Sequence, residues 1–326
     1  MKKSNISIFV PHLGCPNQCS FCNQHTITGQ ESAPSAQDVK NAVEKSLESG
    51  SYRCELAFFG GSFTAIERGY MMELLESASE YVKNKSIEGI RISTRPDCIT
   101  PEILSLLKNY GVTSIELGAQ SMSDDVLEKN RRGHTSKQVE KAASLVKNGG
   151  FELGLQMMTG LYGDTEEKCI NTAKKFISLG CDTCRIYPAV VLKGTYLEKL
   201  MNDGVFIPWG VEKSVEICAV LYEMLENAGV KVLRTGLHSS AGVKENAVGG
   251  AYHEAFGELV SSKIFYNKIT QNPPGQYTAE INKKSLSKLL GQKKSNIELL
   301  CKKGYKINIV YCDDIKTNEL RITKCC

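Results

Sequence analysis

The stretch GCPNQCSFCN, residues 14–23, decides how this chain is interpreted, because it places three cysteines in one short segment. Cys15, Cys19 and Cys22 have the spacing CxxxCxxC, and Phe21 stands directly before the last of them. Cysteine thiolates hold iron–sulfur clusters, so this loop predicts ligands for three irons of a cubane [4Fe–4S] cluster. The fourth iron is then left without a nearby protein ligand. An open metal position lets a site bind a small molecule and act on it chemically.

A zinc knuckle is the alternative use of the same loop. Structural zinc takes four ligands, and His12 or His25 is close enough in sequence to supply the fourth. Three unrelated cysteines are the remaining alternative. The loop alone favours the cluster, and the rest of the chain has to supply the context.

Composition limits the class of protein. The 326 residues fit one large domain, or one domain plus an appendage, and a hydrophobic content of 41% is enough for a real core. No run of about 18 apolar residues occurs, so we expect no membrane span. Thirteen cysteines without an export signal favour a reducing cytoplasm and metal binding over disulfides.

Charge is distributed unevenly along the chain. Residues 261–326 contain 13 Lys and Arg against 5 Asp and Glu, whereas residues 1–260 contain 27 against 31. A basic segment can bind nucleic acid by neutralising phosphates. A lysine-rich surface that is simply solvated is the other interpretation.

Apolar strand-like runs alternate with helical patterns, which is typical of βα units around a parallel sheet. Strands are expected at residues 7–11, 55–60, 89–93, 114–117, 153–158 and 184–191, with a possible further strand at 231–233. Six such units predict an α/β fold, an open (β/α)6 barrel related to the eight-fold TIM barrel. Its catalytic groups would lie at the carboxyl ends of the strands, where the cysteine loop follows the first strand. The pattern changes near residue 255, so we expect a barrel over 1–254 and a small basic α+β appendage over 255–326.

A glycine pair, Gly60 and Gly61, ends the second expected strand in the sequence FFGGSF. Two glycines let a backbone approach a ligand closely. Because the pair follows the strand next to the cysteine loop, we expect it to belong to the same site.

Together these features resemble the radical S-adenosylmethionine (SAM) superfamily. The segments ISTRPD (92–97), ELGAQS (116–121), NRRGHT (130–135), MTGLYG (158–163) and RIYP (185–188) resemble the radical SAM domain of the Elongator catalytic subunit and its bacterial relatives. The resemblance covers roughly residues 5–240. It implies a radical SAM barrel, a [4Fe–4S] cluster on the three cysteines, and SAM chelated to the open iron. The cluster would be reduced by a flavodoxin- or ferredoxin-type donor and would cleave SAM to a 5′-deoxyadenosyl radical.

The resemblance also implies a SAM site. Gly60 and Gly61 would hold the SAM amino group, and a more distant likeness to oxygen-independent coproporphyrinogen oxidase puts further residues near the ribose and carboxylate. The expected cofactor-binding residues are Phe21, Gly60, Gly61, Ser93, Gln120, Arg132 and Gln156. Ser93 stands where the family pattern has glutamate, which weakens the expectation of a ribose contact there.

Catalytic residues are harder to assign. His134 is a candidate for substrate contact or proton donation, and Tyr187 is a candidate for donating a proton or quenching a substrate radical. Packing roles are the alternatives for both. Asp97 is expected to cap the turn into the helix that begins near Thr100.

The sequence leaves several classes of substrate open. About 70 residues follow the barrel, which are too few for the acetyltransferase domain of the Elongator subunit, so its acetyl-CoA chemistry is not expected here. RNA, most simply tRNA, is favoured by the resemblance and by the basic appendage. A protein or small-metabolite substrate is the alternative within the same enzyme class, and a non-catalytic zinc- or RNA-binding module is the alternative outside it.

Overall fold

The computed structural model describes residues 4–10, 15, 18–23, 32–50, 54–238 and 240–325. Its centre is a seven-stranded, entirely parallel sheet in the order β1-β2-β3-β4-β5-β6-β8. The strands are β1 Ser4–Val10, β2 Cys54–Gly60, β3 Ile90–Thr94, β4 Val112–Gln120, β5 Glu152–Thr159, β6 Thr183–Pro188 and β8 Lys231–Thr235. Because β1 and β8 are the edges and do not pair with each other, the barrel is open.

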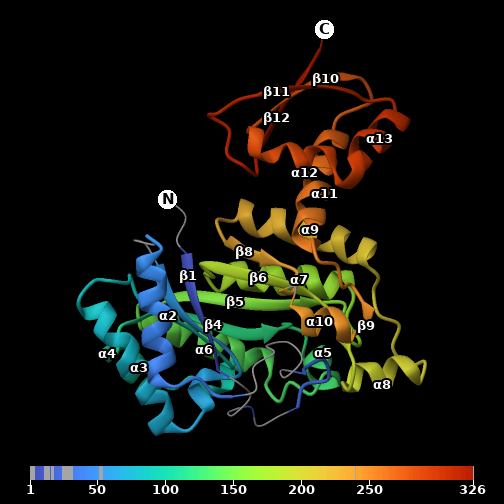
Figure 1. Cartoon of the computed structure of the whole chain (residues 1–326). Helices are drawn as coiled ribbons and strands as arrows, with labels where there is room; N and C mark the ends of the chain where they lie inside the picture. Colours follow the sequence, from blue (N-terminus) through green and yellow to red (C-terminus); the bar gives the residue numbers. More distant parts are fainter. Residues whose placement is uncertain are drawn as a thin grey trace.

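Helices connect the strands and cover the outside of the sheet (Figure 1). They are α2 Ala36–Glu48, α3 Arg68–Lys83, α4 Pro101–Asn109, α5 Asp124–Lys129, α6 Ser136–Asn148, α7 Glu166–Ser178 and α9 Val211–Asn227, with short 3-10 turns at Phe63–Ala65 and Pro96–Cys98. Their starts follow the local sequence. The hydroxyls of Ser35, Thr100 and Thr135 each accept a hydrogen bond from a backbone N–H in the first turn of the following helix.

The two faces of the sheet differ in chemistry. Outward-facing side chains such as Leu56, Phe58 and Ile92 are fully buried and belong to the core between the sheet and the helices. The inward-facing positions of the same strands include Glu55 and Arg91, which are buried in the lumen of the barrel. The hydrophobic core therefore lies outside the sheet, and the lumen is polar.

Smaller elements complete the carboxyl end of the barrel. The strands β7 Val190–Leu192 and β9 Ala247–Gly250 form a separate antiparallel pair, and the helices α8 Tyr196–Asn202 and α10 Ala241–Asn246 flank it. The sequence patterns did not predict β9, α8 or α10, and the strand expected at residues 184–191 is divided into β6 and β7.

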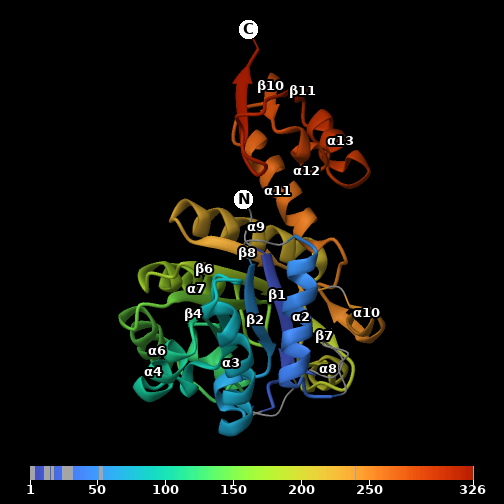
Figure 2. The same ribbon diagram turned by 60° about the vertical axis from the view of Figure 1, so that its left-hand side comes forward.

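The last part of the chain forms a second, smaller sheet in the order β11-β10-β12, in which β10 is parallel to β11 and antiparallel to β12. Its elements are α11 Phe256–Thr270, β10 Gln276–Ile281, α12 Leu286–Leu290, α13 Ser295–Lys302, β11 Lys306–Tyr311 and β12 Leu320–Lys324, with 3-10 turns at Lys283–Ser285 and Gln292–Lys294. Figures 1 and 2 both place this unit beyond α9, on the opposite side of the barrel from α8.

Helix α11 joins the two parts. Phe256, Val260 and Ile264 pack into the core of the barrel, whereas Phe265 and Ile269 belong to the core of the small sheet. One helix therefore contributes to both cores. The division at residues 254/255 stays a proposal.

The predicted fold class is confirmed: the chain is an open α/β barrel with an additional α+β unit, and the tentative strand near residue 231 is the seventh strand of the sheet. Among the described residues, no helix is long and apolar enough to cross a membrane. The predicted zinc alternatives His12 and His25 lie outside the described residues.

Candidate functional site

A cavity of about 600 Å³ opens at the carboxyl end of the barrel sheet. Its lining includes all three cysteines of the loop and every residue predicted to bind the cofactor: Cys15, Cys19, Cys22, Phe21, Gly60, Gly61, Ser93, Gln120, Arg132 and Gln156. Residues from the four strands β2 to β5 and from two loops, separated by up to about 140 positions, thus meet at one place. The predicted grouping is therefore present, while the role of each residue is a separate question.

The described part of the cysteine loop is held by two neighbouring segments. The backbone N–H of Ser20 donates to the Asn130 carbonyl at 3.1 Å, and the Ser20 hydroxyl donates to the Asn130 side-chain oxygen at 2.7 Å. On the other side, the N–H of Leu197 in α8 donates to the Ser20 carbonyl at 2.8 Å. Phe21 packs against the apolar cluster that contains Leu197. The loop is therefore fixed between the end of α5 and the start of α8.

The thiols of the loop are partly or fully buried, and two arginines lie near them. Burial raises the pKa of Cys15, against a hydrogen bond from Ser62 and the charges of Arg95 and Arg132, which lower it. Burial, followed by the charges of the other two cysteines, raises the pKa of Cys22 to about 12. A thiol loses its proton when it binds a metal, because the metal takes the place of the proton on the sulfur.

Arg132 contacts the loop directly. One terminal nitrogen (Nη1) donates to the Cys19 sulfur at 3.0 Å, and the other (Nη2) donates to the Gly118 carbonyl at 2.6 Å. Its Nε is buried and has no hydrogen-bond partner within the described part of the chain. Nη1 and Nη2 each use one N–H on a protein atom, so the Nε–H and one further N–H on each terminal nitrogen are left for a ligand.

Arg95 is the residue of this site that the sequence reasoning missed. It pairs with both carboxylate oxygens of Asp97, at 2.9 and 2.8 Å, and donates to the Arg132 carbonyl at 2.7 Å. Its remaining nitrogen, Nη1, is buried without a partner among the described residues. The expectation that Asp97 caps the following helix is wrong, because Thr100 makes that cap. The segment ISTRPD carried the signal, since Arg95 lies inside it.

The glycine end of β2 makes a close backbone contact. Gly60 has φ +114°, and a Cβ on it would lie 2.3 Å from the carbonyl oxygen of Val10. The N–H of Gly61 donates to the same oxygen at 3.0 Å. Only glycine fits position 60 without moving the backbone of β1. This packing brings the end of β2 against the end of β1, directly before the cysteine loop.

Gln120 ends β4 in an uncommon conformation. Its φ is +66°, and its side-chain oxygen is buried with no hydrogen-bond partner among the residues described. A buried polar group without a partner costs about 1–3 kcal/mol. The conformation and the free acceptor both indicate a position held for a ligand.

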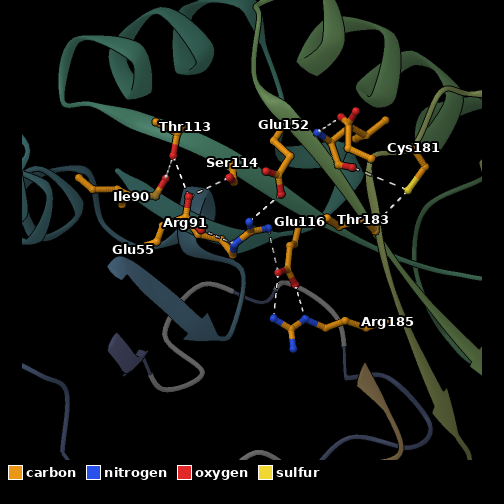
Figure 3. A network of polar contacts seen from close by, with 12 residues as sticks. Glu55, Ile90, Arg91, Thr113, Ser114, Glu116, Glu152, Cys181, Thr183 and Arg185 are labelled. Carbon is orange, nitrogen blue, oxygen red and sulfur yellow. Dashed lines mark hydrogen bonds and ion pairs between the residues drawn. The ribbon is translucent and has the colours of Figure 1, made fainter. Parts of the chain in front are cut away.

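An ionic network fills the lumen below the cavity (Figure 3). Arg91 contacts Glu55 at 3.0 Å, Glu116 at 3.3 Å and Glu152 at 2.6 Å. Arg185 binds Glu116 through two nitrogens, at 2.8 and 3.1 Å.

Two of the predicted cofactor residues join this network at its upper end. Gln156 donates to Glu116 at 2.9 Å and contacts the Ser93 hydroxyl at 3.5 Å. Both side chains face the cavity from the network. Their positions therefore depend on the charged groups below them.

The two catalytic candidates lie in different places. Tyr187 lines the cavity beside Arg185, and burial raises the pKa of its hydroxyl. His134 is not among the residues that line this cavity. Its ring lies against the Ala119 carbonyl at 3.3 Å, and burial, with the charge of Arg132, lowers its pKa to about 4. The structure therefore brings Tyr187 to the site and leaves His134 beside it.

The thiols are not arranged around a single ion. Among the described residues, no three His, Cys, Asp or Glu side chains are grouped so that they could hold one metal ion. A cubane cluster takes one thiolate on each of three different irons, so its ligands surround a larger object.

Comparison with known proteins agrees with this geometry. Residues 9–176 match the family model of the radical SAM superfamily, and residues 181–265 match the model of the radical SAM C-terminal domain. The uncharacterized protein MJ0486 of Methanocaldococcus jannaschii is 30% identical over 207 residues, which are 62% of this chain and 61% of that protein. The tRNA uridine(34) acetyltransferase of Dehalococcoides mccartyi is 24% identical over 243 residues, 63% of this chain and 52% of that protein.

A solved structure shares the fold. Elp3 of Methanocaldococcus infernus, lacking its first 46 residues, has a TM-score of 0.67 and 20% identity, covering 83% of this chain and 64% of that one. The chain thus spans between about half and two thirds of the length of these relatives, and the predicted resemblance to the Elongator subunit is confirmed. The family matches and the shared fold show that the chain belongs to the radical SAM superfamily, whose members are enzymes that use a [4Fe–4S] cluster and SAM.

Proposed function

We propose that Cys15, Cys19 and Cys22 hold the cluster, that SAM binds in the same cavity, and that the substrate is an RNA nucleotide, most simply in tRNA. The observation that carries this proposal is the convergence of the three thiols and three unpartnered buried polar atoms in one cavity. A reduced cluster held there would supply the electron for reductive cleavage of SAM, which is the chemistry that permits hydrogen abstraction from a substrate.

The residues present fit both groups. The thiols of the buried Cys19 and the partly buried Cys15 and Cys22 would supply the metal ligands, and Arg95 and Arg132 would offset the negative charge of thiolates beside them. The free nitrogens of Arg95 and Arg132 are donors suited to the SAM carboxylate, and the free oxygen of Gln120 is an acceptor suited to a ribose hydroxyl. Each unpartnered atom would thereby gain a partner of the correct kind.

The other cavity residues position and shield the reactants. The glycine end of β2 would offer backbone carbonyls to the SAM ammonium group, because glycines have no side chain of their own to block the approach. Phe21 and Met158 provide apolar walls. A wall that excludes water protects a radical from side reactions. Tyr187 faces the cavity with its proton retained, so it is placed to donate hydrogen to a substrate radical.

RNA as the substrate is supported by two observations. The relative from Dehalococcoides mccartyi is named for its action on tRNA uridine, and residues 261–326 carry 13 basic side chains against 5 acidic ones. The basic unit lies beyond α9, across the barrel from α8, which contacts the cysteine loop. It would therefore hold a part of the RNA remote from the reacting nucleotide, which suits a molecule of tRNA size.

The electron donor is proposed to be a flavodoxin- or ferredoxin-type protein, because radical SAM enzymes need a reductant. All twelve cysteines in the described part of the chain are free. Free thiols are the rule in reducing compartments, so we propose that the protein acts in the cytoplasm.

The test is anaerobic reconstitution with iron and sulfide, followed by SAM and dithionite. We expect 5′-deoxyadenosine by liquid chromatography, and none from the triple variant with Cys15, Cys19 and Cys22 replaced by alanine. Total tRNA should increase the rate. A purified protein with zinc and no iron would instead support the binding-module alternative. The alternative result is that tRNA does not stimulate product formation whereas a protein extract freed of RNA does. That result would favour a protein or small-metabolite substrate.

A further inference from the structure

Two arginines of the cavity lie side by side in the barrel sheet. Arg185 of β6 and Arg234 of β8 are paired in register, and both line the cavity. Like charges on directly opposed sheet positions are destabilising. Negative charge near both guanidinium groups would relieve this repulsion.

The negative charge that the protein supplies reaches only one of them. Glu116 takes two hydrogen bonds from Arg185, and the same carboxylate also accepts from Arg91 and Gln156. Within the described ranges, Arg234 has no carboxylate within 4 Å. Its Nη1 lies 3.2 Å from Nδ1 of His238, another residue of the cavity wall. Arg234 thus presents a half-buried positive charge that no described side chain neutralises.

An aromatic surface lies in the same cavity. Phe9 of β1 and Phe59 of β2 are paired in register, and their rings are 6.2 Å apart with an interplanar angle of 42°. Both rings are partly exposed in the cavity. Arg185 lies 5.1 Å from the Phe59 ring, so the aromatic and cationic groups are adjacent.

Polar groups complete the wall along the open edge of the barrel. Asn5 and Ser7 of β1 line the cavity and are exposed, while the alternate residues Ile6 and Ile8 are buried on the outer face. Because β1 has no strand partner on this side within the described residues, these side chains are available to a molecule that enters there.

We propose that this wall is a subsite for one nucleotide of the substrate, with its base against Phe9 and Phe59 and its phosphate on Arg234 and His238. Bases stack on aromatic side chains, and arginine binds phosphate through its planar fork. A nucleotide fits this wall better than a small carboxylic acid does, because a small acid would leave the aromatic surface without a contact. The inference rests on the proposed function and deepens it by naming the group that is recognised.

The test measures binding by calorimetry, on reconstituted protein saturated with SAM and without reductant. The four nucleoside 5′-monophosphates and their nucleosides are titrated separately. We expect at least one monophosphate to bind about tenfold tighter than its nucleoside, since hydrogen bonds to charged groups are strong. Arg234→Gln removes the hydrogen bonds between the guanidinium group and the phosphate. The affinities for the monophosphate and its nucleoside should then lie within about twofold of each other. Lys231→Gln is the control, because Lys231 is exposed on the same strand and does not line the cavity.

A second variant tests the aromatic half. Phe9→Leu should weaken monophosphate and nucleoside alike, by about fivefold or more, and leave their ratio unchanged. Arg234→Lys, which keeps the charge, guards against misfolding of the Gln variant, and should retain part of the preference.

Three results would overturn the proposal: no monophosphate preference in the wild type, an unchanged preference in Arg234→Gln, or ribose 5-phosphate binding as tightly as the nucleotide. The measurement needs no SAM cleavage. A protein that shows the preference but forms no 5′-deoxyadenosine would therefore contradict the proposed chemistry and leave the subsite intact.

Discussion

The amino and carboxyl ends of the barrel lumen both contain buried arginines, but these arginines differ in how many of their nitrogens have partners. At the amino end, Arg91 contacts three carboxylates, and Thr113 and Ser114 donate to Glu55 at 2.9 and 3.0 Å. At the carboxyl end, one polar atom each of Arg95, Gln120 and Arg132 is buried with no partner in the described ranges.

This difference separates structure from function within one lumen. A buried polar group without a partner is costly, and a satisfied network is not. The charged network of the amino end therefore has no need of a ligand, although the buried Thr183 hydroxyl beside Glu116 also has no partner in the described ranges. At the carboxyl end, the proposed ligand would supply the missing partners. Substitutions at the amino end should change stability without changing SAM binding, and substitutions at the carboxyl end should change binding.

The largest effect is expected for Arg91→Met. Removing one partner of a buried ion network leaves uncompensated charge, which costs about 3–5 kcal/mol of unfolding free energy. Urea unfolding measures the loss. Lys147→Met is the matched control, because its pair with Asp182 is partly exposed, and it should cost less than about 1 kcal/mol. If Arg91→Met were as stable as Lys147→Met, the proposed difference between the two ends of the lumen would be wrong. It would also be wrong if Arg91→Met kept its stability but bound SAM more weakly than the wild type.

Gly60→Ala should come next, with a loss of about 2–4 kcal/mol, because the added Cβ meets the Val10 carbonyl and the backbone has positive φ. Gly204→Ala separates the two causes. Gly204 also has positive φ, at +72°, but nothing lies within 4 Å of its Cβ position. Thermal and urea unfolding should show a clearly smaller loss for Gly204→Ala. Equal losses would mean that the close approach at the end of β2 is unimportant.

Arg95→Gln sharpens the comparison at the carboxyl end. We expect the Kd for SAM to rise about tenfold through loss of a charged hydrogen bond. Asp97→Asn is the control, since it weakens the same ion pair from the other side and keeps the arginine. Calorimetry on reconstituted protein should show a smaller change in SAM affinity for Asp97→Asn. A larger change for Asp97→Asn would assign the effect to loop stability.

The smallest effect is expected in the basic unit. Lys283, Lys284, Lys293 and Lys294 are exposed around α12 and form no ion pair within the described part of the chain. Replacing all four by glutamine should weaken tRNA binding several-fold and reduce its dependence on salt concentration. Filter binding at several salt concentrations measures both.

The matched control for the basic unit removes four exposed lysines from the barrel helices, at Lys45, Lys141, Lys174 and Lys199. It changes the net charge equally and should have the weaker effect. The same loss of affinity in both variants would mean that tRNA binding follows net charge and not this surface. In the absence of RNA, the rate of SAM cleavage should be unchanged when Lys283, Lys284, Lys293 and Lys294 are replaced by glutamine.

Sequence patterns predicted most of the features that depend on residues close together in the chain. The six strands, the helix starts at Ser35 and Thr100 and the cysteine loop each have a signal within a few residues. The strand limits were less accurate, since β1 already begins at Ser4. Strand β9 and its pairing with β7 were missed, because each strand is only three or four residues long and its partner is about 60 positions away.

The site was predicted in part for the same reason. Its cysteines and glycines carry their chemistry in their spacing, so they could be found. The contacts of Arg132 with Cys19 and of Arg185 with Glu116 join residues 113 and 69 positions apart. A single sequence contains no signal for such pairs, and only the folded barrel brings them together.

The most direct test of the account is the electron paramagnetic resonance spectrum of the reduced, reconstituted protein with and without SAM. If Cys15, Cys19 and Cys22 hold a cluster whose open iron faces this cavity, the spectrum should change on addition of SAM, and Arg95→Gln should raise the SAM concentration needed for the change. A cluster signal that saturating SAM leaves unaltered would contradict the central claim that cluster and SAM share this end of the barrel.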